Sequence, residues 1–115
     1  MSEIHLINKK ISREELKKIA EERFGDFEKA VVDIEQKIMA IGGELHADEE
    51  AFLLDHGSLQ ENLWGINLYP DKFPNDWIEF DSMINIRPSQ NNRSRQVENL
   101  DIRGRIIEIV TLFVQ

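Results

Sequence analysis

Apolar and polar residues alternate along this chain with two different periods, and each period predicts a different kind of element. The clearest helical period begins after Ser12, which together with Glu15 has the spacing of a capping box. Apolar residues then recur every three or four positions until Gly25, a residue type that commonly ends a helix. We therefore predict a helix from Ser12 to Phe24.

Two further segments carry helical signals. Residues 48–56 begin with acidic side chains and are followed by Gly57, as expected of a short helix. From about Asn99 to Phe113, isoleucine, valine and phenylalanine side chains form one apolar stripe. This stripe predicts a C-terminal helix.

The period of two that is typical of strands appears first in the N-terminal half. Residues 29–43 alternate and then run into two glycines, which predicts a hairpin that turns near Gln36. A helix over residues 26–40 is the competing prediction, because several of these residue types also favour helix. Residues 2–8 show a weaker alternation that is compatible with a short strand.

Two more strands are predicted in the second half of the chain. Residues 64–69 alternate until Pro70 ends the run. Residues 77–87 give the longest alternating run, and we expect it to form a central strand. Asp81, Asn85 and Arg87 would then lie on one face of that strand.

These elements predict an α+β fold in a single globular domain over residues 1–115. The strands fall into two hairpins, so we expect a mostly antiparallel sheet of four strands, or five if residues 2–8 contribute one. The N-terminal, short middle and C-terminal helices would cover this sheet. A chain of 115 residues can build one core without disulfides, and this chain has no cysteine. The lack of cysteine favours a cytoplasmic location.

The charge narrows the range of partners. A net charge of −8 disfavours general nucleic-acid binding, and the apolar runs are too short to suggest a membrane partner. The charge is uneven, however, since residues 87–115 hold five basic and three acidic side chains and residues 1–86 hold nine and nineteen. A local patch can therefore attract an anion that the whole molecule repels.

The most unusual stretch runs from Met83 to Val97, which has three arginines and no acidic residue. An exposed guanidinium flanked by amide groups can hold a carboxylate or phosphate in two-point geometry. The helix N-terminus near Asn99 would add N–H donors. The alternative is a solvated loop whose arginines pair with surface acids. The candidate ligand-binding residues are Asn85, Arg87, Asn91, Asn92, Arg93 and Arg95.

A second candidate site begins at His46, which is followed closely by Asp48 and Glu49. An imidazole beside carboxylates can bind a divalent metal or activate water. The same acids also suit a helix N-terminus, where they stabilise the positive end of the dipole. His46, Asp48 and Glu49 are thus candidate catalytic residues and His46 and Asp48 candidate metal ligands, with a plain helix start as the alternative. We predict no cofactor.

Three strings in the chain are distinctive: GGELHADEE at 42–50, LWGIN at 63–67, and SMINIRPSQ at 82–90 followed by NRSR at 92–95. Together they resemble a small family of uncharacterised prokaryotic proteins, over nearly the whole chain. The resemblance implies a cytoplasmic single-domain protein with no assigned activity. It carries over no catalytic residue.

Three functional hypotheses follow. The first is a binding module that holds a small anionic ligand or partner through the 85–95 segment. The second is a small hydrolase or nuclease-like enzyme in which His46 acts with Asp48 or Glu49 and Arg87 neutralises a phosphate. The third is a structural or regulatory homodimer. The enzyme hypothesis requires His46 and Arg87 to face one cleft.

Overall fold

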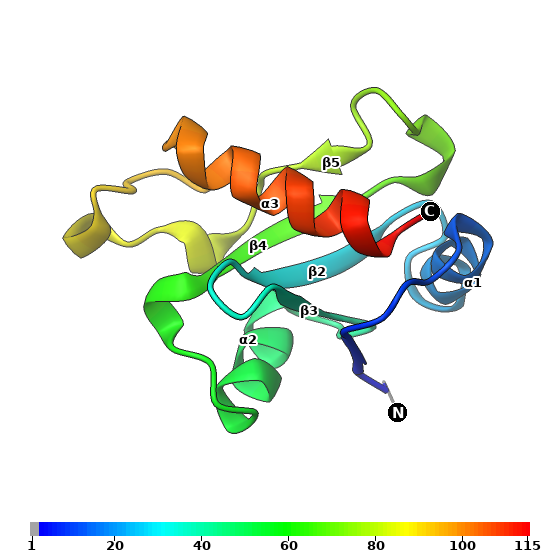
Figure 1. Ribbon diagram of the computed structural model, residues 1–115, viewed down its shortest axis with the longest axis horizontal. Coiled ribbons are helices and arrows are strands. Elements are labelled where there is room, and N and C mark those ends of the chain that lie inside the picture. The colour runs from blue at the N-terminus through cyan, green and yellow to red at the C-terminus, as the bar shows by residue number, and fades with distance from the viewer. Residues whose placement is uncertain (1–2) are drawn as a thin grey trace.

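Alternating apolar residues build a five-stranded sheet, and helices pack on both of its faces (Figure 1). The computed structural model describes residues 3–115. The strands are β1 (His5–Ile7), β2 (Glu28–Asp33), β3 (Ile38–Ile41), β4 (Leu63–Leu68) and β5 (Ile78–Glu79). The helices are α1 (Arg13–Arg23), α2 (His46–Asp55) and α3 (Leu100–Phe113). The predicted α+β class with an antiparallel sheet is confirmed.

The sheet has the strand order β1-β3-β2-β4-β5, and every neighbouring pair is antiparallel. β2 and β3 form a hairpin whose turn is held by Asp33, because its Oδ1 accepts the N–H groups of Glu35 and Gln36, both at 2.9 Å. The predicted hairpin is therefore confirmed and the competing helix is wrong. β1 pairs with β3 and supplies the fifth strand.

The two faces of the sheet carry separate apolar cores. One face packs against α1 and α3 and includes Ala30, Val32, Trp64, Ile66, Leu16, Ile106 and Val110. The other face packs against α2 and includes Val31, Ala40, Leu63 and Leu53. Because side chains alternate along a strand, Lys29 of β2 and Asn67 of β4 lie on the α2 face.

Local capping signals explain where two of the helices begin. Ser12 and Glu15 form the predicted capping box at the start of α1. The side chain of Asn99 accepts the N–H groups of Asp101 and Ile102 at the start of α3. α2 begins two residues earlier than predicted. Within residues 3–115, none of the helices is both long and apolar enough to cross a membrane.

The prediction of a long central strand over residues 77–87 is wrong. Of this run, only β5 forms a strand: it pairs with β4 and lies at the edge of the sheet. Further along, Met83–Asn85 forms a 3-10 turn. The Ser82 hydroxyl accepts the N–H of Ile84 and so caps that turn. Small polar side chains that bond to nearby backbone compete with sheet pairing. As a result the predicted common face of Asp81, Asn85 and Arg87 does not exist.

Candidate functional site

Residues 82–98, which we term the 82–98 loop, are held together by side-chain amides. Asn85 is fully buried, and its Oδ1 accepts the N–H of Gly65 at 2.8 Å. Its Nδ2 donates to the carbonyls of Gly65 and Arg95, both at 3.0 Å. β5 pairs only with Asn67 and Leu68 of β4, and the Asn85 amide makes the hydrogen bonds to Gly65 that a longer neighbouring strand would make. Gly65 permits this approach, because a Cβ there would lie 2.6 Å from Ser82.

Asn92 is the second organising amide of the 82–98 loop. Its Nδ2 donates to the carbonyls of Asn85 at 2.7 Å and Gln96 at 2.6 Å, and its Oδ1 accepts the N–H of Glu98 at 2.9 Å. With both ends of the amide engaged and the side chain buried, Asn92 has no capacity left for a ligand.

Arg87 is also a structural residue. Its guanidinium donates to the carbonyls of Gln60 and Leu63 and stacks over the ring of Trp64, 4.2 Å from the ring centre. The residue is buried. These contacts tie the 82–98 loop to the start of β4 and leave the charge of Arg87 unavailable to solvent.

The remaining predicted loop residues are exposed but separate. Asn91 has a left-handed backbone and closes a short turn by donating to the Pro88 carbonyl. The Arg93 side chain is exposed and has no acidic partner within 4 Å among residues 3–115. Arg95 alone of the six predicted binding residues reaches a cleft shared with His46.

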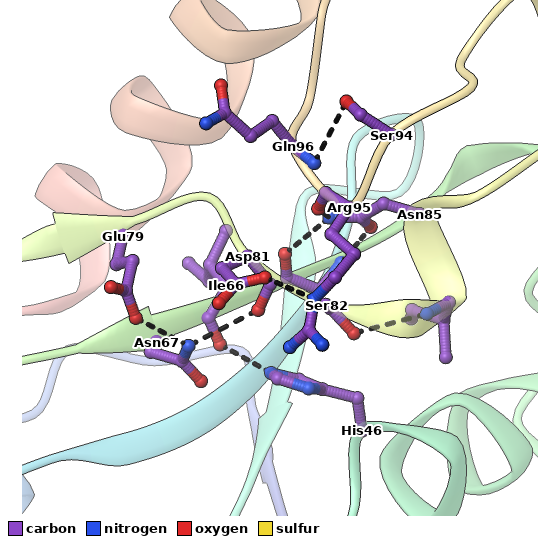
Figure 2. Close-up of polar contacts among 12 residues, drawn as sticks. His46, Ile66, Asn67, Glu79, Asp81, Ser82, Asn85, Ser94, Arg95 and Gln96 are labelled. Carbon is purple, nitrogen blue, oxygen red and sulfur yellow. Dashed lines mark hydrogen bonds and ion pairs between the residues drawn. The ribbon is translucent and has the colours of Figure 1, made fainter.

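That cleft, which we term the His46 cleft, has a volume of about 610 Å³ and opens on the α2 face of the sheet. It lies between the start of α2 and the segment after β5. Its polar lining residues are Lys29, His46, Asn67, Tyr69, Glu79, Asp81, Ser82 and Arg95. Its apolar lining residues are Phe27, Leu45, Ala47, Met83 and Ile84. Figure 2 shows several of the polar side chains directed toward one another.

His46 is held in one tautomer by the backbone of β4. Its Nε2 lies 2.8 Å from the carbonyl of Ile66, so Nε2 carries the proton and Nδ1 is an acceptor (Figure 2). Burial lowers the pKa of His46, although the hydrogen bond to Ile66 opposes this effect. The imidazole is therefore neutral at neutral pH.

Lys29, Asn67 and Glu79 form a row across three strands of the cleft floor. Lys29 is the register partner of Asn67 in β2 and β4, and Asn67 is the register partner of Glu79 in β5. Asn67 Nδ2 donates to Glu79 Oε1 at 2.9 Å and to the carbonyl of Asp81 at 3.2 Å. Among residues 3–115, Asn67 Oδ1 is buried and has no hydrogen-bond partner within 3.5 Å, although the Asn67 side chain lies close enough to His46 to oppose the lowering of its pKa.

Tyr69 completes the surroundings of Glu79. Its hydroxyl donates to Glu79 Oε1 at 3.2 Å. Burial, reinforced by the neighbouring Glu79 carboxylate, raises the pKa of Tyr69. The phenol therefore stays protonated and remains a donor.

Two cations reach the cleft from different elements. Arg95 Nε lies 2.6 Å from Asp81 Oδ1, in an ion pair whose side chains are 54% and 41% exposed. Lys29 has no acidic partner within 4 Å among the described residues. At the cleft wall, the N-cap Leu45 makes no side-chain cap bond, and α2 carries the acidic residues Asp48 and Glu49 in its first turn.

The residues predicted to act with His46 lie elsewhere. Asp48 is exposed in the first turn of α2, whereas Glu49 is fully buried and accepts the N–H of Gly43 at 2.9 Å. Neither residue lines the His46 cleft, and Arg87 does not line it either. His46 and Arg87 therefore do not meet in this cleft. Over residues 3–115, no three His, Asp or Glu side chains gather closely enough to hold a metal ion.

Glu49 has a buried carboxyl neighbour. Glu28 is also fully buried, and its Oε1 accepts the N–H of Gly42 at 3.2 Å. Each carboxyl has one oxygen without a hydrogen-bond partner. Burial raises the pKa of Glu28 to about 7 and raises the pKa of Glu49 well above its ordinary value. Both carboxyls lie outside the His46 cleft.

Sequence reasoning missed Lys29, Asn67 and Glu79 as site residues. A signal for Asn67 was present, because it is the one amide in a strand, Leu63–Leu68, whose other side chains are apolar or absent. Lys29 likewise precedes an apolar run. Only the register of β2, β4 and β5 brings the three together.

Comparison with known proteins identifies the family of the chain. Residues 5–113 match the model of a family described as "Protein of unknown function (DUF5674)". The chain belongs to the DUF5674 family. This confirms the predicted membership of a family without assigned activity. The DUF5674 match spans β1 to the end of α3, so it includes both the 82–98 loop and the His46 cleft. No curated protein and no solved structure matches the chain significantly.

Proposed function

We propose that this DUF5674 protein binds a small anionic ligand, carrying a carboxylate or a phosphate, in the His46 cleft. The observation that carries the proposal is Lys29, a cation on the cleft floor with no acidic partner among the described residues. A charge-assisted hydrogen bond from such a group to an anion is roughly twice as strong as one between neutral groups. Arg95 adds a second cation from the 82–98 loop.

Arg95 is available to a ligand even though it pairs with Asp81. An ion pair this exposed contributes only about 0–1 kcal/mol, because water competes for both groups. A ligand anion can therefore take the place of Asp81 at little cost.

The decisive test compares Arg95 with Arg93. Binding of inorganic phosphate and of acetate is followed by NMR chemical-shift titration on the wild type and on Arg95→Gln, Lys29→Gln and Arg93→Gln. We expect Arg95→Gln and Lys29→Gln each to weaken binding about tenfold, which corresponds to about 1.4 kcal/mol. Arg93→Gln, an exposed arginine of the same loop, should leave binding unchanged.

If Arg93→Gln weakened binding and Arg95→Gln and Lys29→Gln did not, the anion site would lie in the exposed part of the 82–98 loop. If neither anion shifts any resonance of a cleft residue, the proposal is wrong. Mapping the shifted resonances onto Lys29, Asn67 and Arg95, rather than onto Asn91 and Arg93, separates the two locations directly.

A second candidate function, hydrolysis, is favoured by the state of His46. Its neutral imidazole has Nδ1 as a free acceptor in a cleft that also holds Arg95, which takes the part that sequence reasoning assigned to Arg87. Hydrolysis of phosphate and carboxylate esters by the wild type and by His46→Gln tests this. Equal rates in both proteins would remove His46 as a general base.

Two further parts of the proposal concern the setting of the protein. We propose a cytoplasmic location, supported by the absence of cysteine. The alternative function without a ligand is a structural or regulatory homodimer. Sedimentation at several protein concentrations tests the homodimer, because a dimer of functional importance would persist at low protein concentration.

A further inference from the structure

The charged groups of the His46 cleft are balanced rather than purely cationic. Lys29 and Arg95 line the cleft together with Glu79 and Asp81. Arg95 and Asp81 pair with each other. This leaves one cation, Lys29, and one carboxylate, Glu79, and neither has an ion-pair partner within 4 Å among residues 3–115. A simple anion would meet Lys29 but would be repelled by Glu79.

Lys29 and Glu79 are kept apart by the sheet itself. They stand on β2 and β5, with Asn67 of β4 between them in the same row. Neighbouring strands are about 4.8 Å apart, so their Cα atoms are separated by roughly 10 Å. This separation is between backbone positions, from which the two side chains extend; a cation and a carboxylate on one cleft floor are complementary to a ligand with opposite charges at its two ends.

The side chain between them points to the same chemistry. Asn67 is only 7% exposed, and its Nδ2 donates to Glu79 and to the Asp81 carbonyl. Asn67 Oδ1 lies near His46 but has no hydrogen-bond partner within 3.5 Å in the part of the chain that the structure describes. Figure 2 shows the Asn67 amide lying between the Glu79 carboxylate and the His46 ring. A buried acceptor without a donor is costly. A phosphate or carboxylate offers it no N–H, whereas an ammonium group does.

We propose that the His46 cleft binds a small zwitterion, an amino acid or another short amine that bears a carboxylate. The carboxylate contacts Lys29 and Arg95. The ammonium group donates to Asn67 Oδ1 and to Glu79. Leu45 and Met83, which are 53% and 65% exposed at the cleft, would contact the carbon chain of the ligand. This inference rests on the anion-binding function proposed above and adds the second half of the ligand.

The test uses two matched sets of ligands. One set is alanine, propionate and ethylamine, and the other is γ-aminobutyrate, butyrate and butylamine. Within each set the three molecules have similar size and differ in which charges they carry. We expect at least one zwitterion to bind ten times more tightly than both of its singly charged analogues, measured by calorimetry or NMR titration on the full chain.

Variants then assign the two ends of the ligand. Glu79→Gln should weaken binding of the zwitterion and, by removing a repulsive charge, strengthen binding of the carboxylate analogue, so that the preference for the zwitterion disappears. Lys29→Gln should weaken both. Glu108→Gln and Lys37→Gln make the same changes of charge at residues that border a different hollow, and should change neither affinity.

The outcomes separate this inference from the proposal on which it rests. If the carboxylates bind as tightly as the zwitterions, the ligand is a simple anion and only the inference is wrong. If no carboxylate and no zwitterion binds, the inference is wrong, and if inorganic phosphate does not bind either, the proposed function is wrong as well. If Glu79→Gln leaves the preference for the zwitterion intact, the ammonium group does not bind at Glu79 and the inference is overturned.

Discussion

The 82–98 loop and the His46 cleft are both rich in polar side chains, but they use these side chains in opposite ways. In the loop, Asn85 and Asn92 are buried, and each amide bonds at both ends, mostly to backbone groups. In the cleft, among residues 3–115, Lys29 has no acidic partner and contacts only the Phe24 ring, 5.1 Å from its centre, and Asn67 Oδ1 has no hydrogen-bond partner within 3.5 Å. Polar groups with all their bonding capacity engaged hold a fold together, whereas groups with capacity left over can bind something else.

This difference matters because residue type alone suggested the reverse assignment. Arginine and asparagine in an acid-free stretch are typical of an anion site, and five of the six residues predicted on that basis do not line the cleft. Ser82, Met83 and Ile84 at the start of the loop also line the cleft, but of the six predicted residues only Arg95 does, with its backbone carbonyl in the loop network and its side chain at the cleft.

The largest expected effect comes from removing the central amide of the 82–98 loop. Asn85→Ala would leave the N–H and C=O of Gly65 without their side-chain partner in a buried site, whereas the carbonyl of Arg95 would keep the N–H of Ser82. Since each unsatisfied buried group costs about 1–3 kcal/mol, we expect a loss of about 3 kcal/mol of unfolding free energy. Urea denaturation measures it. Asn91→Gly is the matched control, because this exposed asparagine has a positive φ that glycine adopts freely, and it should be nearly neutral.

Arg87→Lys should have the next largest effect. A lysine cannot donate to the carbonyls of Gln60 and Leu63 through a planar fork, nor stack flat on Trp64. We expect destabilisation by about 2 kcal/mol, seen as a lower midpoint of thermal unfolding. Arg93→Lys, the same change at an exposed site, should leave the midpoint in place. Equal midpoints for the two variants would show that Arg87 is not a structural residue.

Glu28 is a third case in the comparison of polar groups: its carboxyl is buried, but among residues 3–115 one of its oxygens has no hydrogen-bond partner. Its folded-state pKa of about 7 lies above its ordinary value of 4.5, so the folded protein holds the proton more tightly than the unfolded chain does. The stability from this group is present below pH 4.5 and is lost as the pH rises through about 7. Glu28→Gln removes the titration while keeping an oxygen that can accept the Gly42 N–H.

We therefore expect Glu28→Gln to be more stable than the wild type at pH 8, by about 1–2 kcal/mol, and close to it at about pH 4.5. Urea denaturation at a series of pH values measures this difference. Glu108→Gln, the same substitution at an exposed position of α3, serves as the control and should show a much smaller change across the series. A gap between Glu28→Gln and wild type that does not grow with pH would contradict the buried, proton-holding state of Glu28.

The smallest effect on folding should come from the cleft itself. Lys29→Gln and Arg95→Gln remove one unpaired cation and one member of an exposed ion pair. We expect each to change the unfolding free energy by no more than about 0.5 kcal/mol. Circular dichroism on heating measures this. A large loss of stability in either variant would place that residue with the structural group rather than with the binding group.

Much of the fold could be predicted because its signals are local. The capping box at Ser12 and Glu15 and the Asn99 cap mark the starts of α1 and α3 within a few residues. The alternation that ends at Gly42 marks the β2–β3 hairpin. Residues 77–87 alternate just as clearly, yet the strand fails, because Ser82 and Asn85 bond to backbone groups and take the place of a strand partner.

By itself, then, the sequence determined the class of the fold, the family and the starts of α1 and α3, since each depends on residues close together in the chain or on the chain as a whole, and it favoured the β2–β3 hairpin while leaving a helix as the alternative. The tertiary structure alone decided which polar groups have bonding capacity left. Whether the side-chain oxygen of Asn67 or Asn85 accepts a hydrogen bond depends on groups far away in sequence. Such a bond can be identified only when the fold has placed both the donor and the acceptor. For that reason the candidate site moved from the arginines of the 82–98 loop to the row of Lys29, Asn67 and Glu79.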